Sequence, residues 1–508
     1  MESKMNLKYL DLLERKLDEQ QMAALSAKGN VIVAAGAGSG KTQVLATRFA
    51  YLVMSYGIKA EKILTLTFTK KAASEMYQRI YKTLEFFANN PDVPSPEKER
   101  AAEAVSDFAR VHIQTLDSYN SSVLKQCASR YGIRPDFTQG DLGSGNDAFE
   151  YVMKRRDSEV IHYLVNEKNS GNLQKIAEDI QKEIMKRSTL ASSSENFLRL
   201  CMTKKAGCLN QWKENRTKVL EGIASYFNGL EDVESNTKTV NECTHTMERL
   251  GNYLETFPDN FDSESFDTFQ DFIKFIDGLK FNLPSGKGTD VVKEIVTQIR
   301  PDNKDGPISK MKLAASYLKD FPNHLAYANF LDEYLIEVNI KKRTSGKLSF
   351  SDISEMALKA LTEQDDLRTQ EQNAYDRIMI DEFQDNNKKN RNLLFLISGK
   401  PGLSAEEILK GKKNLMPEKL FFVGDDKQSI YKFRGADVSV FKELGEDLET
   451  VPVNMVFNYR STEYLLDSFN HIFGGFDREG KKLVEYPGAV FPESVEEDQT
   501  FAATFTKD

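Results

Sequence analysis

The 508-residue sequence contains few residues of the kinds that hold disulfides or structural metals. Its four cysteines are Cys127, Cys201, Cys208 and Cys243, and no two of them form a Cys-x-x-Cys pair. This spacing does not fit a disulfide framework or a zinc ribbon, and it favours reduced thiols. A metal site made by Cys201, Cys208 and Cys243 with His245 remains as an alternative.

Long apolar runs are also missing. No stretch approaches the length that a membrane-spanning helix needs, so no membrane partner is expected. Residues 1–20 lack an apolar run followed by a cleavage site, which excludes a secretory signal there. The sequence therefore predicts a cytoplasmic location.

Neither sign of charge dominates the chain. Lysine and arginine number 68, aspartate and glutamate 77, and the net charge is −9. This balance neither requires nor excludes a nucleic-acid partner, because phosphate binding depends on a local basic groove. The length allows roughly two to four domains with separate cores.

Short apolar runs indicate the fold class. They lie at residues 31–33, 63–68, 111–115, 378–380 and 420–423, and a turn and a helix-like or charged stretch follow each one. Strands that alternate with helices predict an α/β fold with a parallel sheet covered on both faces. Between the two groups of strands, a stripe such as Ile176, Ile180 and Ile184 has helical spacing and predicts a large helical insertion.

The first group of strands contains a phosphate-binding pattern. The run 31–34 leads into Ala35-Gly36-Ala37-Gly38-Ser39-Gly40-Lys41-Thr42, and a helix-like stretch follows. In this strand–loop–helix setting, backbone N–H groups and the helix N-terminus surround phosphates. Lys41 is expected to reach the β- and γ-phosphates, and Thr42 to bind Mg²⁺ through its hydroxyl. The predicted cofactors are therefore ATP and Mg²⁺.

A pair of acids ends the strand at 378–380. At the carboxyl edge of a parallel sheet, Asp381 would hold Mg²⁺ through water, and Glu382 would orient and deprotonate the attacking water. Gln384 would contact the γ-phosphate or this water. A solvated acidic turn is the alternative, and the phosphate loop in the same chain argues against it.

Six further segments occur in the order found in superfamily 1 helicases, namely residues 17–21, 67–76, 114–118, 348–353, 422–437 and 458–462. Together with the loop and the acid pair, they resemble the UvrD/Rep helicases. The 340 residues between Lys41 and Asp381, and the wording KQSIYKFRGAD, are more similar to the RecB/AddA branch. A kinase or transport ATPase is disfavoured, because no acceptor site or LSGGQ-type signature is present.

The resemblance implies a RecA-like domain with a helical insertion and the start of a second RecA-like domain. The expected boundaries are residues 1–135 and 341–450 for the two parts of the first RecA-like domain, 136–340 for the insertion and 451–508 for the truncated second domain. The resemblance assigns Gln21 to the adenine edge, Tyr459 to stacking on adenine, and Gln428 and Arg460 to the γ-phosphate. Gln43 stands where UvrD and Rep have an arginine that helps to sandwich adenine.

The same resemblance implies a groove for single-stranded DNA. Aromatic side chains would stack on bases, while hydroxyls and cations would meet the backbone. The residues expected in this groove are Phe68, Tyr431 and Phe433 for stacking, and Thr67, Thr69, Thr115 and Arg434 for the backbone. Phe433 stands where UvrD-type proteins commonly have tryptophan.

The function expected from these features is an ATP-dependent DNA helicase or translocase of 3′→5′ polarity, acting in DNA repair or recombination. Its partners would be single-stranded or duplex DNA and a second helicase or nuclease subunit. No segment after Arg460 matches the family's motifs V and VI or its nuclease module, which suggests a piece of a longer protein. The alternative is an ATP- and DNA-binding regulatory module without autonomous unwinding.

Overall fold

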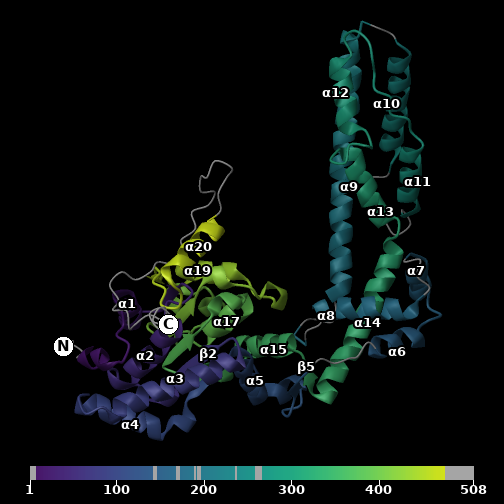
Figure 1. Ribbon diagram of the computed structural model, residues 1–508. Helices are drawn as coiled ribbons and strands as arrows, with labels where there is room; N and C mark the ends of the chain where they lie inside the picture. Colours follow the sequence, from purple (N-terminus) through teal and green to yellow (C-terminus); the bar gives the residue numbers. More distant parts are fainter. Residues whose placement is uncertain are drawn as a thin grey trace. The chain divides into compact units, whose positions relative to one another are not determined.

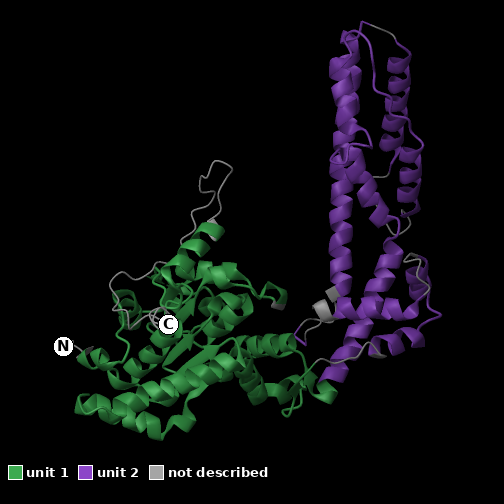
Figure 2. Cartoon of the chain, viewed as in Figure 1, with its two compact units in different colours: residues 1–141, 343–508 green, residues 142–342 purple. Residues whose placement is uncertain are grey.

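The computed structural model describes residues 7–140, 146–167, 172–187, 190–191, 196–234, 237–257 and 266–474. The chain divides into two compact units, which Figure 2 shows in different colours. Unit 1 comprises residues 1–141 and 343–508, and unit 2 comprises residues 142–342. Each unit has hydrophobic cores of its own.

Unit 1 is built on a six-stranded sheet in the order β3-β2-β6-β7-β1-β8, in which all neighbouring strands are parallel. The strands are β1 (Val31–Ala35), β2 (Ile63–Thr67), β3 (His112–Thr115), β6 (Arg377–Ile380), β7 (Leu420–Gly424) and β8 (Val453–Met455). The five apolar runs of the sequence all form strands of this sheet. The predicted α/β class is therefore confirmed.

Helices cover the sheet, as Figure 1 shows. They are α1 (Glu19–Ser26), α2 (Lys41–Met54), α3 (Lys70–Asn89), α4 (Ser95–Ser106), α5 (Leu116–Cys127), α15 (Phe350–Glu363), α16 (Asp365–Ala374), α17 (Lys388–Leu396), α18 (Ala405–Leu409), α19 (Val438–Leu448) and α20 (Glu463–Gly474). A short 3₁₀ helix, η1 (Leu7–Leu12), precedes α1.

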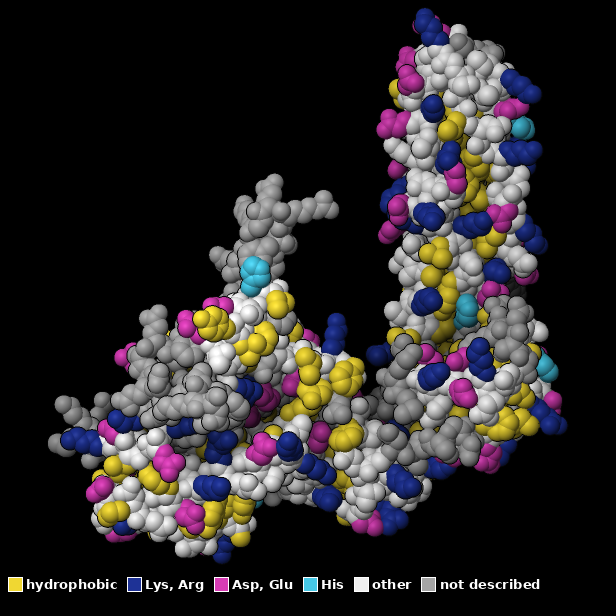
Figure 3. Space-filling model, viewed as in Figure 1, with side chains coloured by type: hydrophobic (Ala, Val, Ile, Leu, Met, Phe, Trp, Pro, Cys, Tyr) yellow, Lys and Arg dark blue, Asp and Glu magenta, His cyan; other side chains and the backbone are white. Residues whose placement is uncertain are grey.

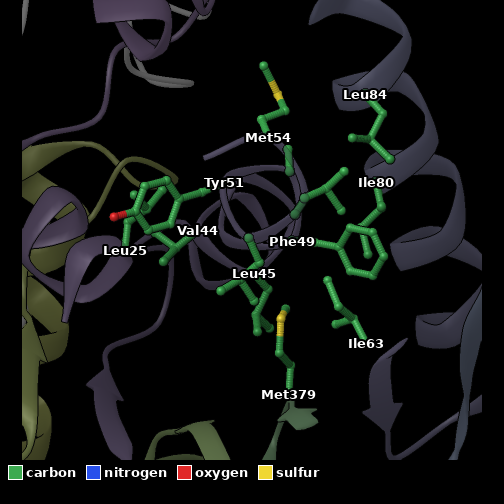
Figure 4. Close-up of a cluster of buried hydrophobic side chains, with 14 of the residues drawn as sticks. Leu25, Val44, Leu45, Phe49, Tyr51, Met54, Ile63, Ile80, Leu84 and Met379 are labelled. Carbon is green, nitrogen blue, oxygen red and sulfur yellow. The ribbon is translucent and has the colours of Figure 1, made fainter. Parts of the chain in front are cut away.

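Alternate side chains of the central strands are buried on opposite faces of the sheet. Val31 and Val33 of β1 belong to a core cluster that includes α2 and α3, whereas Ile32 points to the other face and is equally buried. Figure 4 shows Phe49 of α2 beside Ile80 of α3 in this cluster. Because both faces are covered, β1 is a continuous apolar run without polar alternation.

The strand β8 belongs to the first sheet. Residues 451–508 were expected to begin a second RecA-like domain, and of these residues β8 pairs with β1, while the N–H of Gly36 donates to the carbonyl of Met455 over 2.9 Å. An edge strand of three residues covers backbone groups of β1 that would otherwise lack partners. Residues 475–508 lie outside the described part of the chain. The second domain after β8 stays a prediction.

The chain leaves unit 1 for unit 2, and later returns, next to a two-stranded ribbon of unit 1. In it, β4 (Thr138–Gln139) pairs in parallel with β5 (Lys347–Leu348). This pairing keeps residues 136–141 with unit 1, which places the boundary slightly later than the expected 135/136. The return to unit 1 follows residue 342, close to the expected 340/341.

The described part of unit 2 is helical. It contains α6 (Asn146–Lys154), α7 (Glu159–Glu167), α8 (Leu173–Arg187), α9 (Asn196–Gly229), α10 (Lys238–Thr256), α11 (Phe266–Asp277), α12 (Asp290–Ile299), α13 (Pro307–Leu318) and most of α14 (Phe321–Ser345). Ile176, Ile180 and Ile184 are all buried along α8, so the predicted stripe faces a core. No described helix is long and apolar enough to cross a membrane.

The aromatic cluster around Trp212 is the centre of one core of unit 2. The indole lies 4.3 Å from the ring of Phe257 and 5.8 Å from that of Phe269, measured between centroids. All three side chains are buried, and they come from α9, α11 and the residue after α10. These packed rings hold the three helices together.

Phe269→Ala should lower the free energy of unfolding of unit 2 by about 3–5 kcal/mol, because it leaves a cavity beside the indole. Urea unfolding followed by the fluorescence of Trp212, the single tryptophan of the chain, measures this change. Leu313→Ala on α13 is the control, since Leu313 is 69% exposed. Equal unfolding midpoints for Phe269→Ala and the parent would contradict this account of the core.

Candidate nucleotide and DNA site

The loop between β1 and α2 depends on two glycines. Gly38 and Gly40 have φ values of +73° and +84°, which side chains of other residues rarely adopt. A Cβ at Gly38 would lie 2.7 Å from Oδ1 of Asn458, and one at Gly40 would lie 2.8 Å from Nε2 of Gln21. The loop can therefore turn tightly into α2 while neighbouring side chains pack against its backbone.

Lys41 and Glu382 meet at this loop. Lys41 Nζ lies 3.2 Å from Glu382 Oε2, and the two side chains are 10% and 34% exposed. Glu382 has a left-handed backbone with φ of +50°, an uncommon conformation for a residue with a side chain. Strained backbone of this kind is concentrated at functional sites.

Asp381 is buried beside this pair. Burial, and then the charge of Glu382, raise the pKa of the Asp381 carboxyl to about 7. Its Oδ1 accepts a hydrogen bond of 3.0 Å from the N–H of Glu382. A cation near this carboxyl would favour its ionised form and lower the pKa again.

The oxygen donors at this edge of the sheet fit Mg²⁺. Thr42 lines the cleft described below, and Asp381 directly follows β6, which ends at the same edge of the sheet as β1. Mg²⁺ prefers hard oxygen ligands and usually takes few from protein, with the rest from phosphate and water. Among the described residues, no group of three or more His, Cys, Asp or Glu side chains could hold a metal. The alternative site made by Cys201, Cys208, Cys243 and His245 is therefore not formed.

The site residues surround a cleft of about 520 Å³. The cleft brings together most of the residues that the sequence predicted, namely Gly38, Ser39, Gly40, Lys41, Thr42, Glu382, Gln428, Tyr459 and Arg460. Two arginines that the sequence analysis did not single out, Arg15 and Arg79, also line it. Four cations therefore face a single acid, a balance that suits a polyphosphate.

Other predicted residues lie behind the cleft. Ala35 is the last residue of β1, Gly36 and Ala37 begin the loop, and Gln21 supports the loop from α1. The Gln21 amide donates to the carbonyl of Ser39 over 2.9 Å and accepts from the N–H of Asp18 over 3.2 Å. The backbone N–H and the side-chain oxygen of Gln21 form the capping box of α1 with Asp18, a pattern readable from Asp18-x-x-Gln21, while its Nε2 holds the loop.

Gln384 is likewise engaged at both ends of its amide. Its Nε2 donates to Glu382 over 2.8 Å, and its Oε1 accepts from the N–H of Asp425 over 3.0 Å. The Oδ2 of Asp425 accepts from Gln428 over 2.7 Å. A chain of hydrogen bonds therefore runs from the acid at the cleft to Gln428, with Gln384 buried in its middle.

Gln43, at the position where UvrD and Rep have arginine, turns along its own helix. Its amide donates to the hydroxyl of Thr47 over 3.3 Å. The hydroxyl of Tyr459 donates to Asp18, which ties the ring to the start of α1. No pattern in the sequence indicated that Arg15 would line the cleft. Asn458, in contrast, belongs to the recognised segment 458–462.

Aromatic side chains gather at another part of the same sheet edge. The ring centroids of Phe68 and Tyr431 are 4.7 Å apart, and those of Tyr431 and Phe433 are 5.8 Å apart. Phe433 is 78% exposed. The three predicted stacking residues therefore form one cluster, which we call the aromatic platform. Phe350 at the start of α15 is also exposed and was not predicted.

The hydroxyls predicted to contact the DNA backbone also form hydrogen bonds within the protein. Thr67 and Thr115 are register partners at the ends of β2 and β3, and both are buried. The Thr67 hydroxyl donates to the carbonyl of Thr69, while Thr69 and Thr115 cap α3 and α5. The side chain of Arg434 lies outside the described part of the chain.

The surface of unit 2 offers a contrast. On the face visible in Figure 3, Lys and Arg side chains alternate with Asp and Glu along the helices. This face carries no field of a single sign that would attract phosphates. The cationic cleft and the aromatic platform both belong to unit 1.

Comparisons with known proteins agree with this geometry. An ATP-dependent helicase/nuclease subunit of Lactococcus lactis subsp. lactis is 26% identical over 91% of this chain and 40% of that protein. The protein of the same name from Streptococcus uberis is 26% identical over 90% of this chain and 38% of its own length. The exonuclease/helicase protein RexA of Lactococcus lactis subsp. cremoris is 26% identical over 91% and 40%.

The chain thus spans about two fifths of the length of these curated relatives. They lie on the RecB/AddA branch that the sequence favoured. Residues 17–449, most of the chain, match the family described as the UvrD/REP helicase N-terminal domain. The chain belongs to the UvrD/REP helicase family.

Proposed function

We propose that this chain is the ATP-binding part of an ATP-dependent DNA helicase or translocase that moves 3′→5′ on single-stranded DNA in repair or recombination. The observation that carries the proposal is the 3.2 Å contact of Lys41 with Glu382 in the cationic cleft. It brings the phosphate loop and the acidic strand to one pocket. The polarity is an expectation from family resemblance.

ATP would compete with the carboxylate of Glu382 for Lys41 when it enters the cleft. Its triphosphate would lie against the N–H groups of the loop and the start of α2, with Arg460 neutralising charge on the γ-phosphate. Glu382, released from Lys41, could then accept a proton from the attacking water. Tyr459 would stack on the base.

Thr42 and Asp381 would hold Mg²⁺ between the loop and the acidic strand. Bound there with ATP, the ion would neutralise charge on the phosphates during transfer. The raised pKa of Asp381 fits this role, since a buried carboxyl gains most from a nearby cation. Mg²⁺ and the nucleotide should therefore bind together.

The aromatic platform is proposed as the contact for single-stranded DNA. Bases can stack on Phe68, Tyr431 and Phe433 whatever their sequence, because every base has a π-face. The platform connects to the cleft through Gln384, whose carbonyl accepts a 3.1 Å hydrogen bond from the hydroxyl of Ser429. Rearrangement at Glu382 during ATP turnover would thus reach the segment that carries Tyr431 and Phe433.

Partners are proposed from the relatives. Their names describe them as parts of a helicase/nuclease with more than one chain, which supports a second protein beside this one. The alternative of an ATP- and DNA-binding regulatory module predicts nucleotide binding with very slow turnover. Efficient unwinding by the 508-residue chain alone would exclude that alternative.

Lys41→Ala should weaken ATP binding, and Glu382→Gln should leave binding but slow hydrolysis by about a hundredfold or more, the usual contribution of a general base. The measurement is ATP hydrolysis by the full-length protein, with and without single-stranded DNA.

Lys287→Ala is the matched control for this experiment. Lys287 also follows Ser-Gly, but it is an exposed residue of unit 2 paired with Glu234. Its substitution should change neither binding nor turnover. Hydrolysis that DNA does not stimulate, or that survives in Lys41→Ala, would refute the proposed function.

Phe433→Ala should weaken binding of single-stranded DNA by about tenfold, because one stacked base contributes roughly 1–3 kcal/mol. Phe433→Trp should bind at least as tightly as the parent. Fluorescence anisotropy of a labelled oligothymidine measures both. Tyr464→Ala on α20 removes another highly exposed aromatic ring and should have no effect; an equal loss in both alanine variants would speak against the platform.

A further inference from the structure

Asn458 lies where the segment after β8 passes the phosphate loop. Its side chain is 3% exposed. The Nδ2 donates to the carbonyl of Ala37 over 2.7 Å, while the Oδ1 accepts from the N–H groups of Arg460 and Ser461 over 2.8 and 2.9 Å. One amide therefore fixes a turn and bonds that turn to the loop.

Backbone contacts on both sides strengthen this attachment. The N–H of Tyr459 donates to the carbonyl of Gly38 over 2.9 Å, and the N–H of Gly36 donates to the carbonyl of Met455 over 2.9 Å. The loop from Gly36 to Gly38 is thus hydrogen-bonded three times to residues 455–459. The absence of a side chain at Gly38 leaves the room that Asn458 occupies.

We propose that Asn458 is a positioning residue for nucleotide binding, which holds Tyr459 and Arg460 at the cleft through these hydrogen bonds. This inference rests on the proposed function, since it requires ATP in the cleft. Both residues that follow Asn458 line the cleft, and opening of the turn would shift the backbone that carries them. All the residues that form this attachment belong to unit 1.

The chemistry of the position requires an amide. A carboxylate at 458 would still accept from the two N–H groups, but it has no hydrogen to donate to the carbonyl of Ala37. Two oxygens would then face each other, and a buried carbonyl would lose its partner. Asn458→Asp therefore removes the hydrogen bond to the loop but keeps those that fix the turn, and Asn458→Ala removes both kinds.

The first experiment measures the affinity of the 508-residue chain for ATP labelled with N-methylanthraniloyl. We expect binding about tenfold weaker in Asn458→Asp and Asn458→Ala, the effect of one lost buried hydrogen bond. Asn454→Ala, at an exposed position of β8, should bind like the parent. Parent-like binding by Asn458→Asp and Asn458→Ala would overturn the proposal.

The second experiment asks whether Asn458 acts through its neighbours. In a chain that carries Tyr459→Ala and Arg460→Ala, Asn458→Asp should cost no further affinity, because the groups that it positions are gone. The same tenfold loss in that background would mean that Asn458 supports only the loop, and would overturn the proposal. Lys41→Ala in the same assay keeps the questions separate: parent-like binding by that variant would refute the proposed function itself.

Discussion

The ion pair of Lys41 with Glu382 is the constraint on which the site depends. The residues are 341 positions apart in the sequence, yet β1 and β6 are both neighbours of β7 and end at the same edge of the sheet. Lys41 is nearly buried, and a buried cation without a counter-ion is costly. The loop and the acidic strand therefore stabilise each other until a polyanion replaces the carboxylate.

From that pair, polar groups extend in two directions. On one side, Gln384 and Asp425 connect Glu382 to Gln428 and to the segment of the aromatic platform. On the other side, Asn458 connects the loop to Tyr459 and Arg460, which line the cleft. Because buried amides are costly to leave unpaired, each of these groups has a narrow choice of conformation. The cleft and the aromatic platform are therefore linked by the same hydrogen-bonded groups.

Much of this arrangement was readable from the sequence. Apolar runs ended by glycines or acids predict parallel strands, and their order places Lys41 near Glu382. The sequence could not distinguish helix capping from DNA binding at Thr69 and Thr115, because a threonine hydroxyl can do both. Gln21 and Gln384 also form hydrogen bonds within the protein, and their predicted contacts with the nucleotide stay predictions.

The strand β8 shows what periodicity cannot provide. Val453–Met455 has too few residues to reveal a partner, and only the backbone groups left open along β1 determine that it joins the first sheet.

The length of the helical insertion has little effect on the geometry of the site. The ribbon of β4 and β5 joins the two points where the chain leaves and returns, and unit 2 folds around cores of its own. Closing a longer loop costs only about 0.6 kcal/mol for each doubling of its length. The sheet can therefore accommodate a large insertion between Lys41 and Glu382 while the two side chains remain in contact. Unit 2 adds residues 142–342 to the distance between them in the sequence, and the parallel order of β1, β7 and β6 keeps them close in space.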